Sequence, residues 1–286
     1  MFHRVVPDEP TAFGLPSSYR LRGTALTPAE LEHELDAAPA VVPLGAVENA
    51  LLAGVAPPPG VVLTFDDGYR EHLDVVVPLL RARGMSATFY LMTDIHGGGR
   101  QVAVVDAWYW TLDHAQRPEL RVRLPGGNAF VARCDTREAK LAWVVGSAKR
   151  ALLGASAADQ AAMLRELAAS AECELPADLA AQLYLAPGDW QRLADSGMRV
   201  GAHSLTHPRL TLLPDDALHR EVSESIAVLS PLGQPATFAY PDGAFDDRVA
   251  AKVAAHAISA VTCEVGTVSG GQDRLRLPRR FVAGFA

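Results

Sequence analysis

Five short apolar runs, separated by segments with helical patterns, constrain the fold of this chain more than any other feature of its sequence. The runs cover residues 61–65, 87–92, 198–202, 236–240 and 257–262. Mostly apolar runs of this length are typical of strands that are buried on both faces, as in a parallel sheet. Because helical patterns alternate with these strands, the sequence predicts βα units arranged in a mostly parallel sheet or barrel.

Three helix starts can be recognised around these strands. Residues 27–30 read Thr-Pro-Ala-Glu, which is a capping box with proline at the first helical position. Asp189 is predicted to cap a helix that runs through Leu193. Residues 214–216 read Pro-Asp-Asp and predict a third helix, whose acidic first turn suits the helix dipole.

The segment from about Gly97 to Pro187 departs from this alternation, because no comparable apolar run occurs in it. Instead it contains a glycine turn at 97–99, an aromatic cluster at 108–110, and alanine-rich helical patterns near 136–153 and 157–171. We interpret residues 97–187 as a helical insertion in a single domain that spans residues 1–286. Its aromatic side chains are expected to form core rather than a platform for stacking sugars.

Composition and charge narrow the class of protein. The chain of 286 residues is 49% hydrophobic and 21% charged, which is ordinary for a globular protein and unlike a disordered one. Its net charge of -7 argues against a nucleic-acid partner. Cys134, Cys173 and Cys263 are widely spaced. We therefore expect reduced thiols rather than a disulfide framework or a cysteine-based zinc site.

Targeting signals also bear on the class. The first ten residues lack the apolar stretch and the small-residue cleavage site of a signal peptide. No uninterrupted apolar run reaches the roughly 18 residues that a membrane-spanning helix needs. The expectation is a soluble cytoplasmic protein with no membrane span.

Two adjacent carboxylates follow the first predicted strand. Residues 64–69 read Thr-Phe-Asp-Asp-Gly-Tyr, which puts Asp66 and Asp67 at the strand end. Ligand-binding and catalytic groups of βα folds collect at the carboxyl ends of strands. Neighbouring carboxylates repel unless a cation or a proton lies between them. Asp-Gly is also an ordinary turn sequence, so this motif alone leaves both interpretations open.

Two histidines follow another predicted strand. Residues 201–208 read Gly-Ala-His-Ser-Leu-Thr-His-Pro, with His203 and His207 spaced as i and i+4. On a helical turn this spacing lets both imidazoles reach one metal ion. One carboxylate from the first motif would complete a two-histidine, one-carboxylate set, which leaves positions open for water and substrate. Together the two motifs predict a metal site.

The order of these motifs, Thr-Phe-Asp-Asp-Gly and then His-Ser-x-x-His-Pro, resembles the NodB-homology domain of polysaccharide deacetylases, carbohydrate esterase family 4. The resemblance implies a deformed, incompletely closed (β/α) barrel and a hydrolase that removes an N-acetyl or similar acyl group from an amino sugar or glycan. It implies that Asp66 is the catalytic base. It also implies that Asp67, His203 and His207 bind a divalent ion, usually Zn²⁺.

The third family motif departs from its usual form. That motif is commonly Arg-x-Pro-Tyr, whereas residues 238–243 read Phe-Ala-Tyr-Pro-Asp-Gly, with Ala239 in place of the arginine and Asp242 in place of the tyrosine. This form is similar to the branch that contains poly-N-acetylglucosamine deacetylases. Tyr240 and Asp242 are assigned to the oxyanion or substrate site, since the main-chain N–H of Asp242 does not depend on its side chain. Asp242 as a plain turn residue is equally open.

The general acid has to be sought at the start of the chain. The last family motif, Leu-x-His, supplies the acid near the C-terminus, but no histidine follows His256. The same branch resembles a circular permutation with Tyr-His-x-Val in an N-terminal strand, and residues 2–5 read Phe-His-Arg-Val. His3 is therefore the candidate acid, with a surface histidine as the alternative.

Arg279, in the final predicted strand at 275–282, could supply the cation that the altered third motif lacks beside Asp66. A solvated or phosphate-binding arginine is the other interpretation. Five remaining histidines lie in no comparable context and are expected on the surface: His33, His72, His96, His114 and His219.

Two other functions remain open. One is hydrolysis of a non-sugar amide, formamide or cyclic imide, in which the ligand set of Asp67, His203 and His207 would persist. The other is a carbohydrate-binding module that is catalytically weak because of its altered third motif. The presence of Asp66 disfavours the second function.

Overall fold

The computed structural model describes residues 1–94 and 102–282, so the glycine turn expected at 97–99 lies outside the described residues. The chain forms two compact units. The first comprises Met1–Val5, Pro28–Gln101 and Ala181–Ala286, and the second comprises Val6–Thr27 and Val102–Ala180. The second unit therefore includes an N-terminal segment as well as most of the segment that we interpreted as an insertion.

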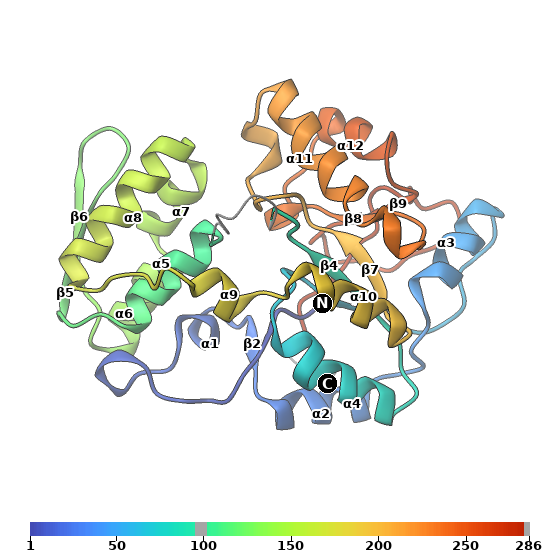
Figure 1. Cartoon of the computed structure of the whole chain (residues 1–286), viewed down its shortest axis with the longest axis horizontal. Coiled ribbons are helices and arrows are strands. Elements are labelled where there is room, and N and C mark those ends of the chain that lie inside the picture. The colour runs from blue at the N-terminus through green and yellow to red at the C-terminus, as the bar shows by residue number, and fades with distance from the viewer. Residues whose placement is uncertain (95–101, 283–286) are drawn as a thin grey trace. The chain divides into compact units, whose positions relative to one another are not determined.

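The first unit is built on a parallel sheet of five strands (Figure 1). Its order is β3 (Leu63–Phe65), β4 (Ala87–Leu91), β7 (Arg199–Ala202), β8 (Thr237–Ala239) and β9 (Ser259–Val261). Each strand lies within one of the five predicted apolar runs, so the predicted parallel βα arrangement is confirmed. Every residue of β3, β4, β8 and β9 is buried, as expected of strands covered on both faces.

The two ends of the chain extend this sheet at its edges. Phe2 forms a parallel bridge with β3, and Leu277 forms one with β9. The main-chain carbonyl of Met1 accepts a hydrogen bond of 3.3 Å from the N–H of Val282, so the two added segments meet. The sheet is thus curled into a barrel closed only by short irregular pairing. The predicted deformed, incompletely closed (β/α) barrel is confirmed.

Helices of the first unit surround these strands in Figure 1, and α10 and α11 pack against β7. One turn of π-helix (His72–Val76) runs directly into α4. A short strand and the remaining helices have these bounds: β1 (Arg4–Val5), α2 (Pro28–Ala37), α3 (Leu44–Leu52), α4 (Val77–Ala82), α9 (Leu179–Leu183, at the boundary of the units), α10 (Pro187–Asp195), α11 (Asp215–Ala227) and α12 (Asp247–Ala254).

Two of the three predicted helix starts are confirmed. Helix α2 begins at Pro28, and α11 begins at Asp215 with two acidic residues in its first turn. Asp189 is the third residue of α10 rather than its cap, so that assignment was wrong. Its carboxylate accepts a hydrogen bond of 3.0 Å from the N–H of Ala186, the residue that precedes the helix. It therefore stabilises the same helix start from inside the first turn.

The second unit combines helices with a hairpin. Its elements are α1 (Ser18–Arg22), β2 (Ala25–Leu26), α5 (Val104–Asp113), β5 (Glu119–Arg123), β6 (Ala129–Arg133), α6 (Arg137–Val145), α7 (Ser147–Gly154) and α8 (Ala157–Ala171). Trp108 and Tyr109 are fully buried in its core, as predicted for the aromatic cluster, and Trp110 packs against that core while partly exposed. The helix predicted at 136–153 is two helices that break at Gly146, where a Cβ would lie 1.9 Å from the carbonyl oxygen of Ala142.

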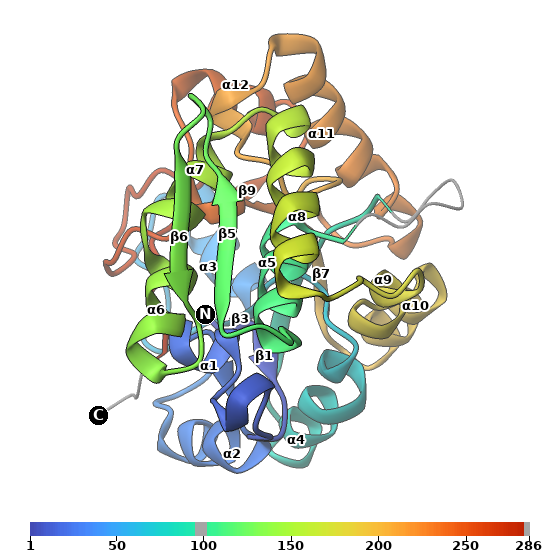
Figure 2. The ribbon, with the colours of Figure 1, turned by 90° about the vertical axis from the view of Figure 1, so that its left-hand side faces the viewer.

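The interpretation of residues 97–187 as a helical insertion missed a pair of strands. Strands β5 and β6 pair antiparallel, and Figure 2 shows them alongside α8, which β5 contacts. Strand β5 alternates exposed and buried side chains, a half-buried pattern in which no continuous apolar run occurs. Its turn includes Gly126 and Gly127, both at positive φ, where glycine carries no penalty.

No helix within residues 1–94 and 102–282 is long and apolar enough to cross a membrane. Cys134, Cys173 and Cys263 are free thiols.

Candidate active site

The turn after β3 separates the two neighbouring carboxylates. Asp66 still follows the strand, since its N–H donates to the carbonyl of Phe2 at 3.0 Å. Asp67 has φ of 75°, in the left-handed region that is costly for a residue with a Cβ. Gly68 follows with the same φ. The two side chains consequently have different partners: Asp66 pairs with Arg279, and Asp67 faces the two histidines.

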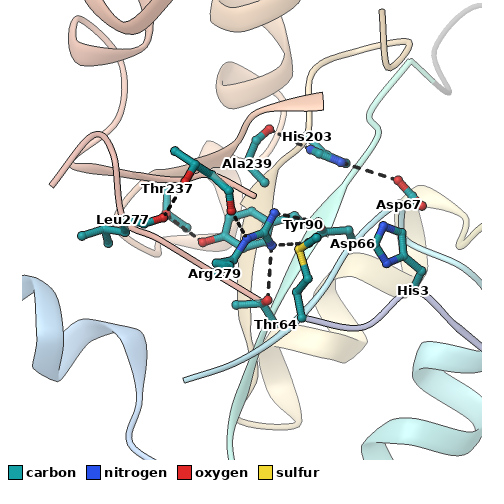
Figure 3. Close-up of polar contacts among 12 residues, drawn as sticks. His3, Thr64, Asp66, Asp67, Tyr90, His203, Thr237, Ala239, Leu277 and Arg279 are labelled. Carbon is teal, nitrogen blue, oxygen red and sulfur yellow. Dashed lines mark hydrogen bonds and ion pairs between the residues drawn. The ribbon is translucent and has the colours of Figure 1, made fainter. Parts of the chain in front are cut away.

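Asp66 pairs with Arg279 inside the barrel (Figure 3). Two parallel hydrogen bonds join the groups, from Nη1 to Oδ1 at 2.7 Å and from Nη2 to Oδ2 at 2.8 Å. Asp66 is 2% exposed and Arg279 is 8% exposed. Burial raises the pKa of Asp66, but the charge and the hydrogen bonds of Arg279, together with the nearby His203 and His3, outweigh this and hold the pKa well below its usual range. The carboxylate is therefore ionised at neutral pH.

Other contacts fix the orientation of the guanidinium. Arg279 Nε donates to the carbonyl of Thr262 at 2.9 Å, and Nη1 also donates to Thr64 Oγ1 at 3.2 Å. The guanidinium carbon lies 5.5 Å from the ring centroid of Tyr90. Gly201 makes room for that ring, because a Cβ there would lie 2.7 Å from it. The arginine that the sequence offered as a cation for Asp66 is thus held in place by three strand ends.

Asp67 forms a cluster with His203 and His207. Their donor atoms all lie within 4.8 Å of one another. Asp67 Oδ1 is 3.6 Å from His203 Nε2 and 3.7 Å from His207 Nε2. Neutral imidazole nitrogens and a carboxylate oxygen are ligands that suit Zn²⁺, so these three residues could hold one divalent cation.

The main chain determines which nitrogen of His203 is available. His203 Nδ1 lies 2.7 Å from the carbonyl oxygen of Ala239, which can only accept, so Nδ1 carries the proton. The lone pair of Nε2 then faces Asp67, as in metal sites where a second contact orients the histidine. Burial, and next the neighbouring His207, lower the pKa of His203 to about 3. The ring is therefore neutral at pH 7.

The segment that carries both histidines is not a helical turn, so that part of the sequence prediction was wrong. Ser204 and His207 both have left-handed φ, of 62° and 59°. Ser204 Oγ accepts from the N–H of His207 at 3.0 Å. Glu221 of α11, which the sequence analysis did not single out, accepts from the N–H groups of Leu205 and Thr206 at 2.9 and 3.1 Å. This irregular loop brings the two imidazoles together.

His3 lies in the same site. The rings of Phe2 and Phe65 stack at 4.9 Å on one face of the sheet, so the residues after them, His3 and Asp66, face the interior. The charges of Asp66 and His207 act on the imidazole of His3, which Figure 3 draws together with Asp66 and Asp67. Burial lowers the pKa of His3 to about 4, although the charge of Asp66 opposes this effect.

Tyr240 and Asp242 have surroundings of a different kind. The hydroxyl of Tyr240 donates to the carbonyl of Leu275 at 3.0 Å, and its ring stacks on Phe245 at 5.0 Å. These contacts engage the Tyr240 side chain in packing, and no contact found among the described residues joins it to the three candidate ligands. Asp242 is exposed and lies in a tight turn with φ of 55°. This conformation is the one expected if Asp242 is a turn residue.

The prediction that His72 lies on the surface was wrong. Its side chain is 0% exposed, and its Nε2 lies 2.6 Å from the carbonyl oxygen of His3. His33, His114 and His219 are exposed as expected, and His96 lies outside the described residues. His72 is one turn beyond the Asp-Asp motif, where the chain packs back on β3 and β4. A single histidine in a mixed segment carries no sequence signal for that burial.

Comparison with known proteins places the chain in a family. The model of the polysaccharide deacetylase family matches residues 53–109 and 153–261. The chain therefore belongs to the polysaccharide deacetylase family and is an amide-hydrolysing deacetylase. A comparison with curated protein sequences returned no match.

Solved structures with the same fold are distant in sequence. The deacetylase PplD of Streptococcus pyogenes, in complex with acetate, is 17% identical with a TM-score of 0.58, over 98% of this chain and 89% of that one. IcaB from Ammonifex degensii is 17% identical with a TM-score of 0.57, over 99% and 89%. The de-N-acetylase from Aggregatibacter actinomycetemcomitans is 15% identical with a TM-score of 0.57, over 99% and 95%. At these identities the likeness shows the fold.

Replacement of Arg279 should destabilise the protein in a pH-dependent way. The variant Arg279→Met leaves the buried Asp66 carboxylate without its partner, which should cost about 3–5 kcal/mol at neutral pH. Because Arg279 depresses the pKa of Asp66, its stabilisation is present above the usual carboxyl pKa of about 4. In the variant that pKa rises, so the loss should be smaller at about pH 5 than at about pH 7. Urea unfolding at both pH values measures it.

Two controls accompany this experiment. The variant Arg280→Met changes the exposed neighbouring arginine and should alter the free energy of unfolding by less than about 0.5 kcal/mol. The double variant Asp66→Asn/Arg279→Met removes both charges and should recover part of the stability. An equal loss in Arg280→Met would contradict a special role for the buried pair.

Proposed function

We propose that this chain is a metal-dependent deacetylase that removes an N-acetyl or similar acyl group from an amino sugar or a sugar-containing substrate. One observation carries the proposal. The ionised carboxylate of Asp66, paired with Arg279, stands next in the chain to Asp67, whose own carboxylate faces His203 and His207. A proton acceptor and a metal-ligand set are thereby adjacent but chemically distinct.

A divalent cation bound by Asp67, His203 and His207, for which Zn²⁺ is the first candidate, would polarise the acyl oxygen and lower the pKa of a bound water from about 15.7 toward about 7. The neutral state of His203 supports this assignment, because only an unprotonated nitrogen can bind a cation. The carbonyl of Ala239 holds that ring so that Nε2 is the free nitrogen.

Asp66 then serves as the base. Arg279 keeps it ionised, and each carboxylate oxygen has a second lone pair besides the one in the ion pair. As the water oxygen bonds to the amide carbon, Asp66 accepts the proton that the water releases. Because both oxygens are anchored, the carboxylate stays in position during this transfer.

His3 is proposed as the acid. When the bond between the acyl carbon and the nitrogen breaks, the amine can leave only if the nitrogen gains a proton. Burial keeps the His3 ring neutral before the reaction, so it takes up a proton from solvent as negative charge develops beside it and passes that proton to the nitrogen. Asp66 then releases to solvent the proton that it accepted from water. The products are a carboxylic acid, acetate for an N-acetyl substrate, and a free amine.

The direct test of this function is a panel of N-acetylated amino sugars and short oligosaccharides, incubated with Zn²⁺-loaded enzyme and examined by mass spectrometry. Loss of acetyl groups is expected with the wild-type chain. With Asp66→Asn, turnover should fall by roughly 10²–10⁴-fold, the range for loss of a positioned base. A parallel panel of non-sugar amides, formamides and cyclic imides provides the contrast. Turnover confined to that second panel would refute the proposed substrate class.

Metal content should separate the two neighbouring aspartates. Purified protein should contain about one equivalent of a divalent metal by elemental analysis, and His207→Ala and Asp67→Asn should lose most of it, since each removes a ligand. Asp66→Asn should retain it, because its carboxylate is occupied by Arg279. If Asp66→Asn loses the metal while Asp67→Asn keeps it, the two roles are exchanged.

His3→Ala should lower turnover of an N-acetyl sugar by roughly 10²–10⁴-fold with little change in metal content, because it removes the proton donor. An activated ester with a good leaving group needs less help from an acid, so its hydrolysis should fall much less. Steady-state kinetics with both substrates measure the contrast. Equal losses for the two substrates would point to a structural defect, and wild-type rates would exclude His3 as the acid.

A further inference from the structure

Among the described residues, the side chain of His72 makes one hydrogen bond, and it is with the backbone of the proposed acid. The 2.6 Å distance joins His72 Nε2 to the carbonyl oxygen of His3. A carbonyl oxygen only accepts, so Nε2 must carry the proton and donate it. The second nitrogen, Nδ1, is buried and has no hydrogen-bond partner in the described part of the chain. The neutral ring with its proton on Nε2 satisfies this arrangement.

The surroundings of the ring are aromatic. His72 is the first residue of the π-helical turn that precedes α4, and such turns often occur at functional sites. Its ring centroid lies 5.6 Å from that of Phe65, 5.8 Å from Tyr69 and 5.4 Å from Phe89. An apolar side chain would fill this place without burying an unpaired nitrogen, which costs free energy. The advantage of an imidazole here is its bond to His3.

That bond completes the constraints on His3. Its preceding residue, Phe2, is held to β3 by two main-chain hydrogen bonds, from Phe2 N to Thr64 O at 2.8 Å and from Asp66 N to Phe2 O at 3.0 Å. The ring of His3 is stacked on Phe281, with centroids 5.3 Å apart and planes 13° apart. The bond from His72 holds the main-chain carbonyl of His3, which follows the part of the segment that pairs with β3.

We propose that His72 is a positioning residue that acts through the main-chain carbonyl of His3 and aims its imidazole at the leaving amine. The inference rests on the proposed function of His3 as the acid. His72 lies in the aromatic cluster with Phe65 and Phe89, and it acts on the proton donor through the backbone. A shift of about 1 Å in a catalytic group is enough to cost on the order of 10²-fold in rate.

Three substitutions test the contact. His72→Gln retains an N–H at a reach similar to that of Nε2, whereas His72→Asn is also an amide but is too short, and His72→Leu has no donor. Turnover of an N-acetyl sugar should fall roughly 10–100-fold in the Asn and Leu variants, with little change in KM or metal content. The Gln variant should stay within a few-fold of the wild type. Equal rates for Gln and Asn would overturn the inference.

A double-mutant cycle with His3 separates positioning from general damage. In the His3→Ala background the carbonyl is still held but no acid is present, so His72→Leu or His72→Asn should have almost no further effect on turnover. If the two losses multiply, His72 acts independently of His3 and the inference is wrong. If His3→Ala alone has the wild-type rate, the proposed function of His3 fails instead. Urea unfolding of each variant identifies any that do not fold. If His72→Leu is one of these, the comparison of turnover between His72→Gln and His72→Asn tests the inference.

Discussion

The buried pair of Asp66 and Arg279 is the interaction on which the rest of the site depends. Two charges in the interior of a barrel are costly unless each is neutralised and hydrogen-bonded, and both conditions are met here. Arg279 also bonds to Thr64 on β3 and to the carbonyl of Thr262 after β9, strands at opposite edges of the sheet. The contact that keeps Asp66 ionised is therefore one of those that close the barrel.

Position in the sequence matters less to this chemistry than position in space. The family motif that usually supplies an arginine has Ala239 at that place, and the charge comes from Arg279 in the C-terminal segment. Ala239 instead contributes its main-chain carbonyl to His203, a function that any residue could perform there. A substitution in a motif therefore leaves a site intact when another segment delivers the same charge to the same carboxylate.

The sequence predicted the elements that are marked by a local pattern of residue types, such as an apolar run or a short motif. Five strands were recognised as short, mostly apolar runs, and the motifs of the candidate metal ligands follow two of them. Strand β5 was missed because its buried side chains alternate with charged ones. His72 and Glu221 were missed for another reason, since each is a single polar residue whose burial depends on segments distant in the chain. Tertiary packing alone determines such positions.

Asp67 and the irregular loop that carries His203 and His207 show how backbone strain and hydrogen bonding balance in this site. Asp67, Ser204 and His207 all have left-handed backbones, each at a cost of about 1–3 kcal/mol. The bonds from the loop to Glu221, and from His207 N–H to Ser204 Oγ, offset part of that cost. Protein contacts hold both histidines of the loop, through the bonds of His203 Nδ1 to the carbonyl of Ala239 and of His207 N–H to Ser204 Oγ. Protein contacts also set the position of His3. They are the strand pairing of Phe2, the stacking of the His3 ring on Phe281 and the bond to His72.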